Sequence, residues 1–402
     1  MIIQPAKRTE AVQEYYFSRK LKEIAAINRR NAEAGLPPVI NLGIGAPDGM
    51  PPEAAIRTLT ESARRTDVHA YQSYVGLDAL REAFAAWYSR YYGVSLDPAC
   101  EIQPLVGSKE GILLIALAFL DPGDGVLVPD PGYPTYTSAS RLAEARILTY
   151  DLREERHWQP DFEALERSDL SGVKLMWVNY PHMPTGASAT PEGMARIVDF
   201  ARRHGILVVN DNPYSFILNP GEKLSLLQVP GAKECCIEFN SMSKSYNMPG
   251  WRIGLLATNA EFITWILKVK TNIDSGTFRA LQLAAAEALT NNTDEWHLQA
   301  NVHTYAPRRA IAEQIMQALG CTFDPRQTGM FLWGRIPDSY ATVEELTERV
   351  LHEARVFITP GFIFGSNGER YVRISLCAKE ERMREALERI IKVKSEKWKS
   401  EK

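Results

Sequence analysis

Short apolar, strand-like runs alternate with helical patterns from about residue 100 to residue 258. This alternation is typical of an α/β domain in which helices flank a mostly parallel sheet. Ligands of such sheets bind outside the carboxyl ends of the strands, so polar residues there are the first candidates for a functional site. The runs are Val126–Val128, Ile147–Tyr150, Val173–Asn179, Ile206–Asp211, Cys235–Asn240 and Ile253–Ala257.

A lysine in a hydroxyl-rich segment follows the fifth of these runs. Lys244 stands after Ser241 and Ser243, and Arg252 follows eight residues later. Lysine is the side chain that forms a Schiff base with a cofactor aldehyde. Serine hydroxyls and a planar guanidinium together suit a phosphate ester. The segment therefore predicts a pyridoxal phosphate site in which Lys244 carries the cofactor.

Other contacts that this cofactor needs have candidates near the strand ends. A protonated ring nitrogen requires a carboxylate beside it; Asp211 ends an apolar run, and Tyr214 is close enough to reach the phenolic oxygen. The segment Gly107–Ser108–Lys109 leads into an apolar helical run, which predicts an anion site at a helix N-terminus. Tyr133 offers a ring for stacking, and Asn179 stands at another strand end.

These residues resemble the class I/II aminotransferases of the aspartate aminotransferase superfamily. The resemblance extends from Leu42–Asp48 to Tyr371–Ser375 and includes the block Asn179–Gly186. It implies the type I pyridoxal phosphate fold, an α/β fold with a large domain and a smaller α/β domain. We expect the large, cofactor-binding domain at residues 46–293. Residues 1–45 and 294–402 are expected to form the small domain.

The resemblance also implies roles for individual residues. Lys244 matches the residue that holds the cofactor and shuttles the substrate α-proton, and Arg252 matches the phosphate arginine. Arg373 matches the arginine that binds the substrate α-carboxylate, with the backbone of Gly45 nearby. Tyr71 matches a tyrosine that reaches the phosphate of the neighbouring subunit, which implies a homodimer with shared active sites. The alternative for Tyr71 is a core aromatic residue.

One position departs from the family pattern. Most relatives have an asparagine before Pro–Thr–Gly that donates a hydrogen bond to the cofactor's phenolic oxygen, whereas this chain has Met183, which has no donor. Either Tyr214 acts alone, or a nearby donor such as Asn179 or His182 substitutes.

Composition excludes several classes of partner. The formal net charge of −3 gives no basic footprint for nucleic acid or for an anionic membrane. No apolar run approaches the ~18–20 residues of a membrane span, and the N-terminal residues lack the apolar stretch of a secretory signal. The five cysteines have no metal-site spacing, and their odd number suggests reduced thiols in a cytoplasmic protein.

Together these features predict an aminotransferase that moves an α-amino group from an amino acid to a 2-oxo acid with ping-pong kinetics. A β-eliminating lyase on the same scaffold is one alternative, and a non-catalytic cofactor-binding regulator is another. Lys109 and Arg279 are candidates for a second cation that would bind a dicarboxylate donor. The segments around Lys109 and Lys268–Phe278 look like the diaminopimelate and alanine/methionine branches of the family.

Overall fold

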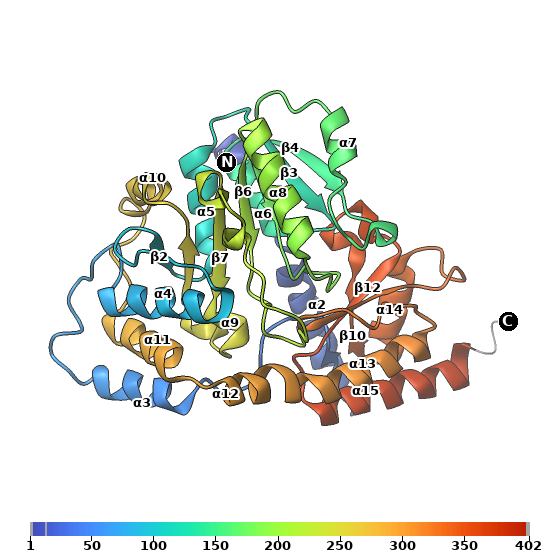
Figure 1. Cartoon of the computed structure of the whole chain (residues 1–402). Helices are drawn as coiled ribbons and strands as arrows, with labels where there is room; N and C mark the ends of the chain where they lie inside the picture. The colour runs from blue at the N-terminus through green and yellow to red at the C-terminus, as the bar shows by residue number, and fades with distance from the viewer. Residues whose placement is uncertain (1–2, 13, 399–402) are drawn as a thin grey trace.

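The computed structural model describes residues 3–12 and 14–398. Its centre is a seven-stranded sheet in the order β2-β8-β7-β6-β5-β3-β4 (Figure 1). The strands β7, β6, β5, β3 and β4 run parallel, and β8 is antiparallel to both of its neighbours. The predicted mostly parallel sheet is therefore confirmed. The strands are β2 (Ile102–Leu105), β3 (Gly125–Asp130), β4 (Arg146–Asp151), β5 (Val173–Val178), β6 (Leu207–Asp211), β7 (Cys236–Ser241) and β8 (Gly254–Ala257).

Helices cover both faces of this sheet. In β5, Met176 packs into one hydrophobic cluster and Trp177 into the other, and Val208 and Val209 of β6 divide in the same way, because successive side chains of a strand point to opposite faces. Strands buried on both faces leave few places for a free polar group. The covering helices include α4 (Asp78–Tyr92), α5 (Ser108–Phe119), α6 (Pro134–Leu142), α8 (Pro191–His204), α10 (Ala260–Lys270) and α11 (Arg279–Asn291).

A second sheet belongs to the C-terminal part of the chain. It is antiparallel, in the order β11-β12-β9, and β12 is labelled on the right of Figure 1. The N-terminal part joins the same region, because β1 pairs in parallel with β10. This pairing agrees with the packing that the resemblance implies, while the domain boundaries themselves stay a prediction. The elements are β1 (Ile40–Asn41), α2 (Tyr16–Glu33), β9 (Phe331–Arg335), α14 (Val343–Glu353), β10 (Val356–Phe357), β11 (Thr359–Pro360), β12 (Tyr371–Ser375) and α15 (Glu380–Val393).

A long helical element connects the two sheets. The sequence predicts it over Asp294–Leu319, and the structure forms it from α12 (Asp294–Leu298), a π-helical turn (Gln299–His303) and α13 (Tyr305–Leu319). It runs along the lower edge of the molecule in Figure 1 and packs against α15. The remaining helices are α1 (Lys7–Glu10), α3 (Glu53–Ser62), α7 (Phe162–Arg167) and α9 (Met242–Ser245).

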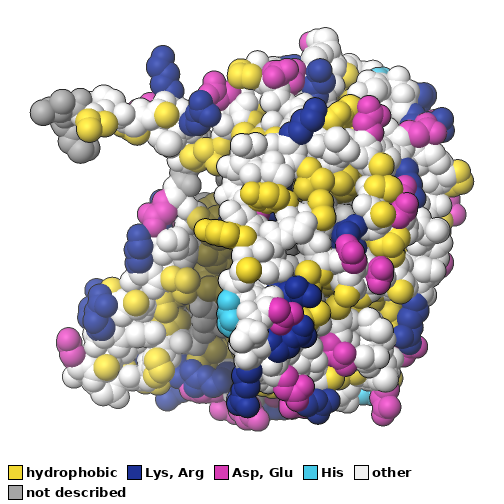
Figure 2. Space-filling view, turned by 90° about the vertical axis from the view of Figure 1, so that its left-hand side faces the viewer, with side chains coloured by type: hydrophobic (Ala, Val, Ile, Leu, Met, Phe, Trp, Pro, Cys, Tyr) yellow, Lys and Arg dark blue, Asp and Glu magenta, His cyan; other side chains and the backbone are white. Residues whose placement is uncertain are grey.

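The surface is mixed in character. On the face that Figure 2 shows, charged side chains of both signs lie among hydrophobic ones, and the face is deeply hollowed on its left-hand side. Within the described part of the chain, no helix is long and apolar enough to cross a bilayer.

Candidate active site

The carboxyl ends of the parallel strands meet at one cavity of about 570 Å³. Tyr133 follows β3, Asn179 follows β5, Asp211 ends β6, and Lys244 lies in α9 directly after β7. The topology therefore brings together residues that are far apart in the sequence. Of the predicted site residues, those that line this cavity are Gly45, Ser108, Lys109, Tyr133, Asn179, Asp211, Tyr214, Ser241, Ser243, Lys244, Arg252 and Arg373.

Lys244 presents its amine to the cavity. The Nζ atom donates a hydrogen bond to the carbonyl of Gly45 at 2.6 Å. Desolvation lowers the pKa of Lys244 below its usual range, and the nearby positive charges of Arg373 and Arg252 act in the same direction. A lowered pKa favours the neutral amine, which is the form that acts as a nucleophile or a base.

Only one of the two carboxylate oxygens of Asp211 has a hydrogen-bond partner in the described structure. Its Oδ2 atom accepts a hydrogen bond from the hydroxyl of Tyr136 at 3.0 Å. The Oδ1 atom is buried and has no hydrogen-bond partner in the described structure. Burial raises the pKa of Asp211 to about 6, against the hydrogen bond from Tyr136 and the charge of Lys244, which lower it. A buried oxygen without a donor suits a ligand that brings one.

An anion-binding corner lies at the start of α5. Gly107 precedes this helix with φ of 76°, and a Cβ at Gly107 would stand 2.0 Å from Nη2 of Arg252. Arg252 also donates to the hydroxyl of Ser243 at 3.3 Å, and the hydroxyl of Ser241 lies on the same cavity. The free N–H groups of a helix N-terminus, two hydroxyls and a guanidinium suit a phosphate group. Gly107 thus contacts the predicted phosphate arginine without lining the cavity itself.

Arg373 is enclosed by aromatic rings. Its guanidinium carbon lies 3.9 Å from the ring centre of Phe331 and 4.7 Å from that of Phe364. One nitrogen donates to the carbonyl of Gly43 at 2.7 Å and another contacts the sulfur of Met183 at 3.2 Å. The residue is 4 % exposed, and burial lowers its pKa to about 10. A buried guanidinium that meets no carboxylate among the described residues is suited to binding one from a substrate.

Comparison with known protein families shows to which family this chain belongs. A family profile described as "Aminotransferase class I and II" matches residues 37–390. This chain belongs to the class I and II aminotransferases. An LL-diaminopimelate aminotransferase of Moorella thermoacetica is 41 % identical over 392 residues, which are 97 % of this chain and 98 % of the relative. One of Dehalococcoides mccartyi is 38 % identical over 97 % of this chain and 99 % of its own length.

Solved structures agree with the sequence relatives. Substrate-bound BacF of Bacillus subtilis has a TM-score of 0.89 at 33 % identity and covers 98 % of both chains. A probable N-succinyldiaminopimelate aminotransferase of Thermus thermophilus has a TM-score of 0.84 at 34 % identity, over 92 % of this chain and 99 % of that one. The predicted fold, cofactor and reaction class are confirmed: the protein is a pyridoxal phosphate-dependent aminotransferase. The comparisons give no support to the lyase or the regulator.

The residues around the cavity fit pyridoxal phosphate. The unpartnered Oδ1 of Asp211 can accept the proton of a ring nitrogen, and the corner formed by Ser108, Ser243 and Arg252 can hold the phosphate. The amine of Lys244 lies on the same cavity. This agreement rests on the donors and acceptors of this chain rather than on the family assignment alone.

Tyr71 and Arg279 do not line this cavity. Tyr71 is 91 % exposed, so the alternative that it is a core aromatic residue is wrong. Arg279 lies 4.0 Å from the carboxylate of Asp67 and does not line the cavity. Of the two predicted second cations, only Lys109 lines the site.

The structure shows which donors near Met183 can replace the family's asparagine at the cofactor's phenolic oxygen. The amide nitrogen of Asn179 donates to the carbonyl of Asp211, and its oxygen accepts from the backbone N–H of Met183 at 2.8 Å. His182 pairs with the hydroxyl of Thr185 at 2.7 Å and does not line the cavity. Among the donors considered, Tyr214 and the second N–H of Asn179 remain available to the cofactor.

Several residues of the site were not identified from the sequence. Tyr136 bonds to Asp211, and Phe331 and Phe364 enclose Arg373. Tyr15 and Phe17 reach the cavity from the N-terminal part of the chain. Tyr136 lies in α6, three residues after Tyr133, so its closeness to Tyr133 in the sequence was a usable signal; the others come from distant segments with no local motif.

The arrangement around Arg373 yields a prediction. Arg373→Lys keeps the charge but loses the planar fork. We therefore expect kcat/KM for amino acid substrates to fall roughly 30- to 1,000-fold, which corresponds to a loss of ~2–4 kcal/mol in transition-state binding. Met183→Leu is the matched control, because a thioether is a weak acceptor and its loss should change kcat/KM by less than about fivefold. An Arg373→Lys enzyme with full cofactor content and unchanged kcat/KM would remove Arg373 from the site.

Proposed function

We propose that Lys244 holds pyridoxal phosphate and carries the substrate α-proton, that Asp211 keeps the ring nitrogen protonated, and that Arg373 binds the substrate α-carboxylate. When bound, the cofactor supplies an aldehyde that takes up the amino group and a ring that accepts electrons. The main support is that these three residues line one cavity and that none of them forms an ion pair within the described residues.

The residues of the chain have distinct tasks in this proposal. The lowered pKa of Lys244 leaves its amine free to take a proton and to return it, and the carbonyl of Gly45 orients that amine. Tyr214 and Tyr133 line the cavity; in this proposal Tyr214 donates a hydrogen bond to the cofactor and Tyr133 supplies a ring that stacks on it. An amino acid leaves as a 2-oxo acid, and a second 2-oxo acid then enters the same site.

We infer that the amino donor has a second carboxylate at the far end of its side chain. Lys109 lines the cavity with its Nζ 4.9 Å from the ring centre of Tyr15. Asp211 is the one carboxylate among the described residues that line the cavity. The named relatives are LL-diaminopimelate aminotransferases, so LL-diaminopimelate is the first donor to test.

A panel of amino donors tests this inference. LL-diaminopimelate, 2-aminoadipate, methionine and alanine are compared with 2-oxoglutarate as acceptor, in the parent and in Lys109→Met. Losing a partly exposed ion pair should raise KM for the dicarboxylic donors by about 3- to 10-fold, while KM for alanine stays unchanged. Lys109→Arg keeps the charge and is the control. Equal changes for all donors would show that Lys109 does not bind the distal carboxylate.

We also infer a homodimer in which Tyr71 completes the partner's site. Tyr71 is exposed and lies away from its own cavity. Its segment packs beside Phe278, where His69 stacks on the Phe278 ring at 5.9 Å, and Phe278 and Ile273 are themselves exposed. Exposed apolar side chains that gather in one place often mark an interface.

The cytoplasmic location stays a prediction from the cysteine count.

Subunit mixing tests the shared site. Lys244→Ala and Tyr71→Ala are each expected to be nearly inactive. In a mixed dimer one site has both an intact Lys244 and an intact Tyr71. With random exchange, half of the dimers are mixed and each has one good site of two, so about a quarter of the parent activity should return. No recovery after exchange, or a monomer by light scattering, would contradict the inference.

A further inference from the structure

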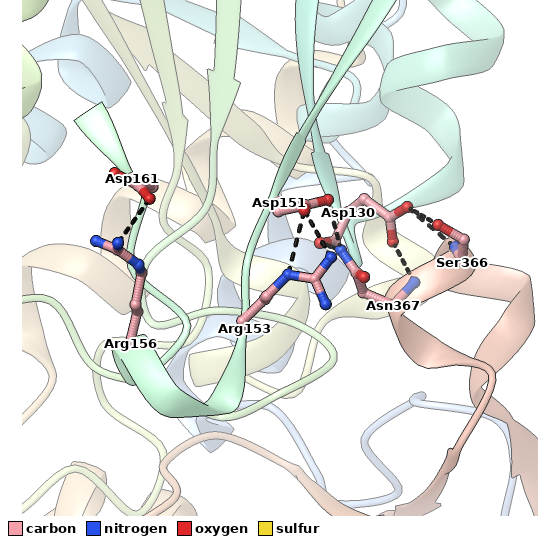
Figure 3. A network of polar contacts seen from close by, with 7 residues as sticks. All are labelled: Asp130, Asp151, Arg153, Arg156, Asp161, Ser366 and Asn367. Atoms are coloured by element: carbon pink, nitrogen blue, oxygen red, sulfur yellow. Dashed lines mark hydrogen bonds and ion pairs between the residues drawn. The ribbon is translucent and has the colours of Figure 1, made fainter. Parts of the chain in front are cut away.

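Asp130 inserts its carboxylate into a turn that belongs to the second sheet. It is the last residue of β3 and is 6 % exposed. Its two oxygens accept hydrogen bonds from the backbone N–H of Ser366 at 3.0 Å, the hydroxyl of Ser366 at 2.6 Å and the backbone N–H of Asn367 at 2.9 Å (Figure 3). In residues 3–12 and 14–398 no ion pair balances this carboxylate, so these bonds hold it.

Further bonds join the same two segments. The side-chain amide of Asn367 donates to the carbonyl of Asp130 at 3.0 Å and to the carboxylate of Asp151 at 2.9 Å (Figure 3). The backbone N–H of Gly132 donates to the carbonyl of Phe364 at 2.7 Å. We call the contact of Asp130 with Ser366 and Asn367 the Asp130 latch. It connects the end of β3 in the seven-stranded sheet to the turn between β11 and β12.

The turn is shaped to receive this carboxylate. Gly365 has φ of 138°, a region that favours glycine, and a Cβ there would stand 2.1 Å from an oxygen of Asp130. Gly361 and Gly368 approach so closely that a Cβ on either would meet the carbonyl of the other at 2.3 or 2.1 Å. Glycine at these positions allows the backbone to fold around the side chain from the other sheet.

The latch lies between two walls of the active site. Phe364 stands two residues before Ser366, lines the cavity and packs on the guanidinium of Arg373. Tyr133 stands three residues after Asp130 and lines the same cavity. A fixed contact between Asp130 and the turn therefore sets where the wall around Arg373 lies relative to Tyr133.

We propose that Asp130 is a positioning residue of this aminotransferase. The Asp130 latch holds Phe364, and through it the guanidinium of Arg373, in the place where a substrate carboxylate binds. It acts mainly on the affinity for amino and oxo acids, because the anchored turn carries Phe364, whereas Lys244 and Asp211 lie on other elements that the latch does not touch. This proposal rests on the proposed role of Arg373.

Asp130→Asn tests the latch in the holoenzyme. An amide has one acceptor oxygen, and its NH₂ group would face N–H donors. We expect KM for both the amino acid and the 2-oxo acid to rise about tenfold or more, with kcat within about threefold and the cofactor dissociation constant within about twofold. Ser366→Ala removes one of the bonds and keeps the backbone donors, so it should raise KM in the same direction by less; it also serves if Asp130→Asn does not fold.

Arg156→Gln is the control. It breaks the ion pair of Arg156 with Asp161 at 2.8 Å, which involves neither Asp130 nor the turn (Figure 3), so all parameters should stay at parent values. Unchanged KM values in Asp130→Asn would overturn the proposal. A cofactor affinity that falls by as much as the KM values rise would also overturn it, because it would show a structural role only. If Arg373→Lys also leaves kcat/KM unchanged, the proposed role of Arg373 fails; if Arg373→Lys lowers kcat/KM and Asp130→Asn leaves KM unchanged, the latch alone fails.

Discussion

A parallel sheet that is buried on both faces determines where this protein places its chemistry. Because helices cover both sides, the middle of each strand is lined by apolar side chains or by polar groups that satisfy one another, as Asn210 and Glu238 do at 2.9 Å. Ligands of such a sheet bind outside the carboxyl ends of its strands, where polar side chains can reach them. The residues that line the cavity from β3, β5, β6 and β7 follow from this constraint.

The cavity concentrates groups whose usual charge is disfavoured. Burial raises the pKa of Asp211 and lowers that of Arg373, and desolvation lowers that of Lys244. A buried charge without a partner destabilises the folded state, so the free protein keeps an unfavourable arrangement of charged groups at this cavity. Perturbed pKa values of this kind cluster at functional sites, and here they coincide with the residues that the motifs select.

The sequence was sufficient for the sheet and the cofactor, and most of the candidate site residues that it selected line one cavity. Periodicity identified the strands, and the position of Lys244 and Asp211 at strand ends predicted their proximity. What it could not predict depends on contacts between distant segments. Nothing near Phe364 indicates that it covers Arg373, and nothing near Asp130 indicates the turn at Ser366. Met183 was recognised as a departure, but its contact with Arg373 depends on the packing of β12 against the loop after β5.

Borohydride reduction of the holoenzyme tests most directly whether Lys244 carries the cofactor. Reduction fixes the cofactor to the amine that holds it, and peptide mapping by mass spectrometry then locates the modified lysine. We expect one pyridoxyl group in the parent enzyme, on Lys244. Lys244→Ala should carry no label, and Lys109→Met should be labelled as the parent is. A pyridoxyl group on any other lysine of the parent enzyme would contradict it.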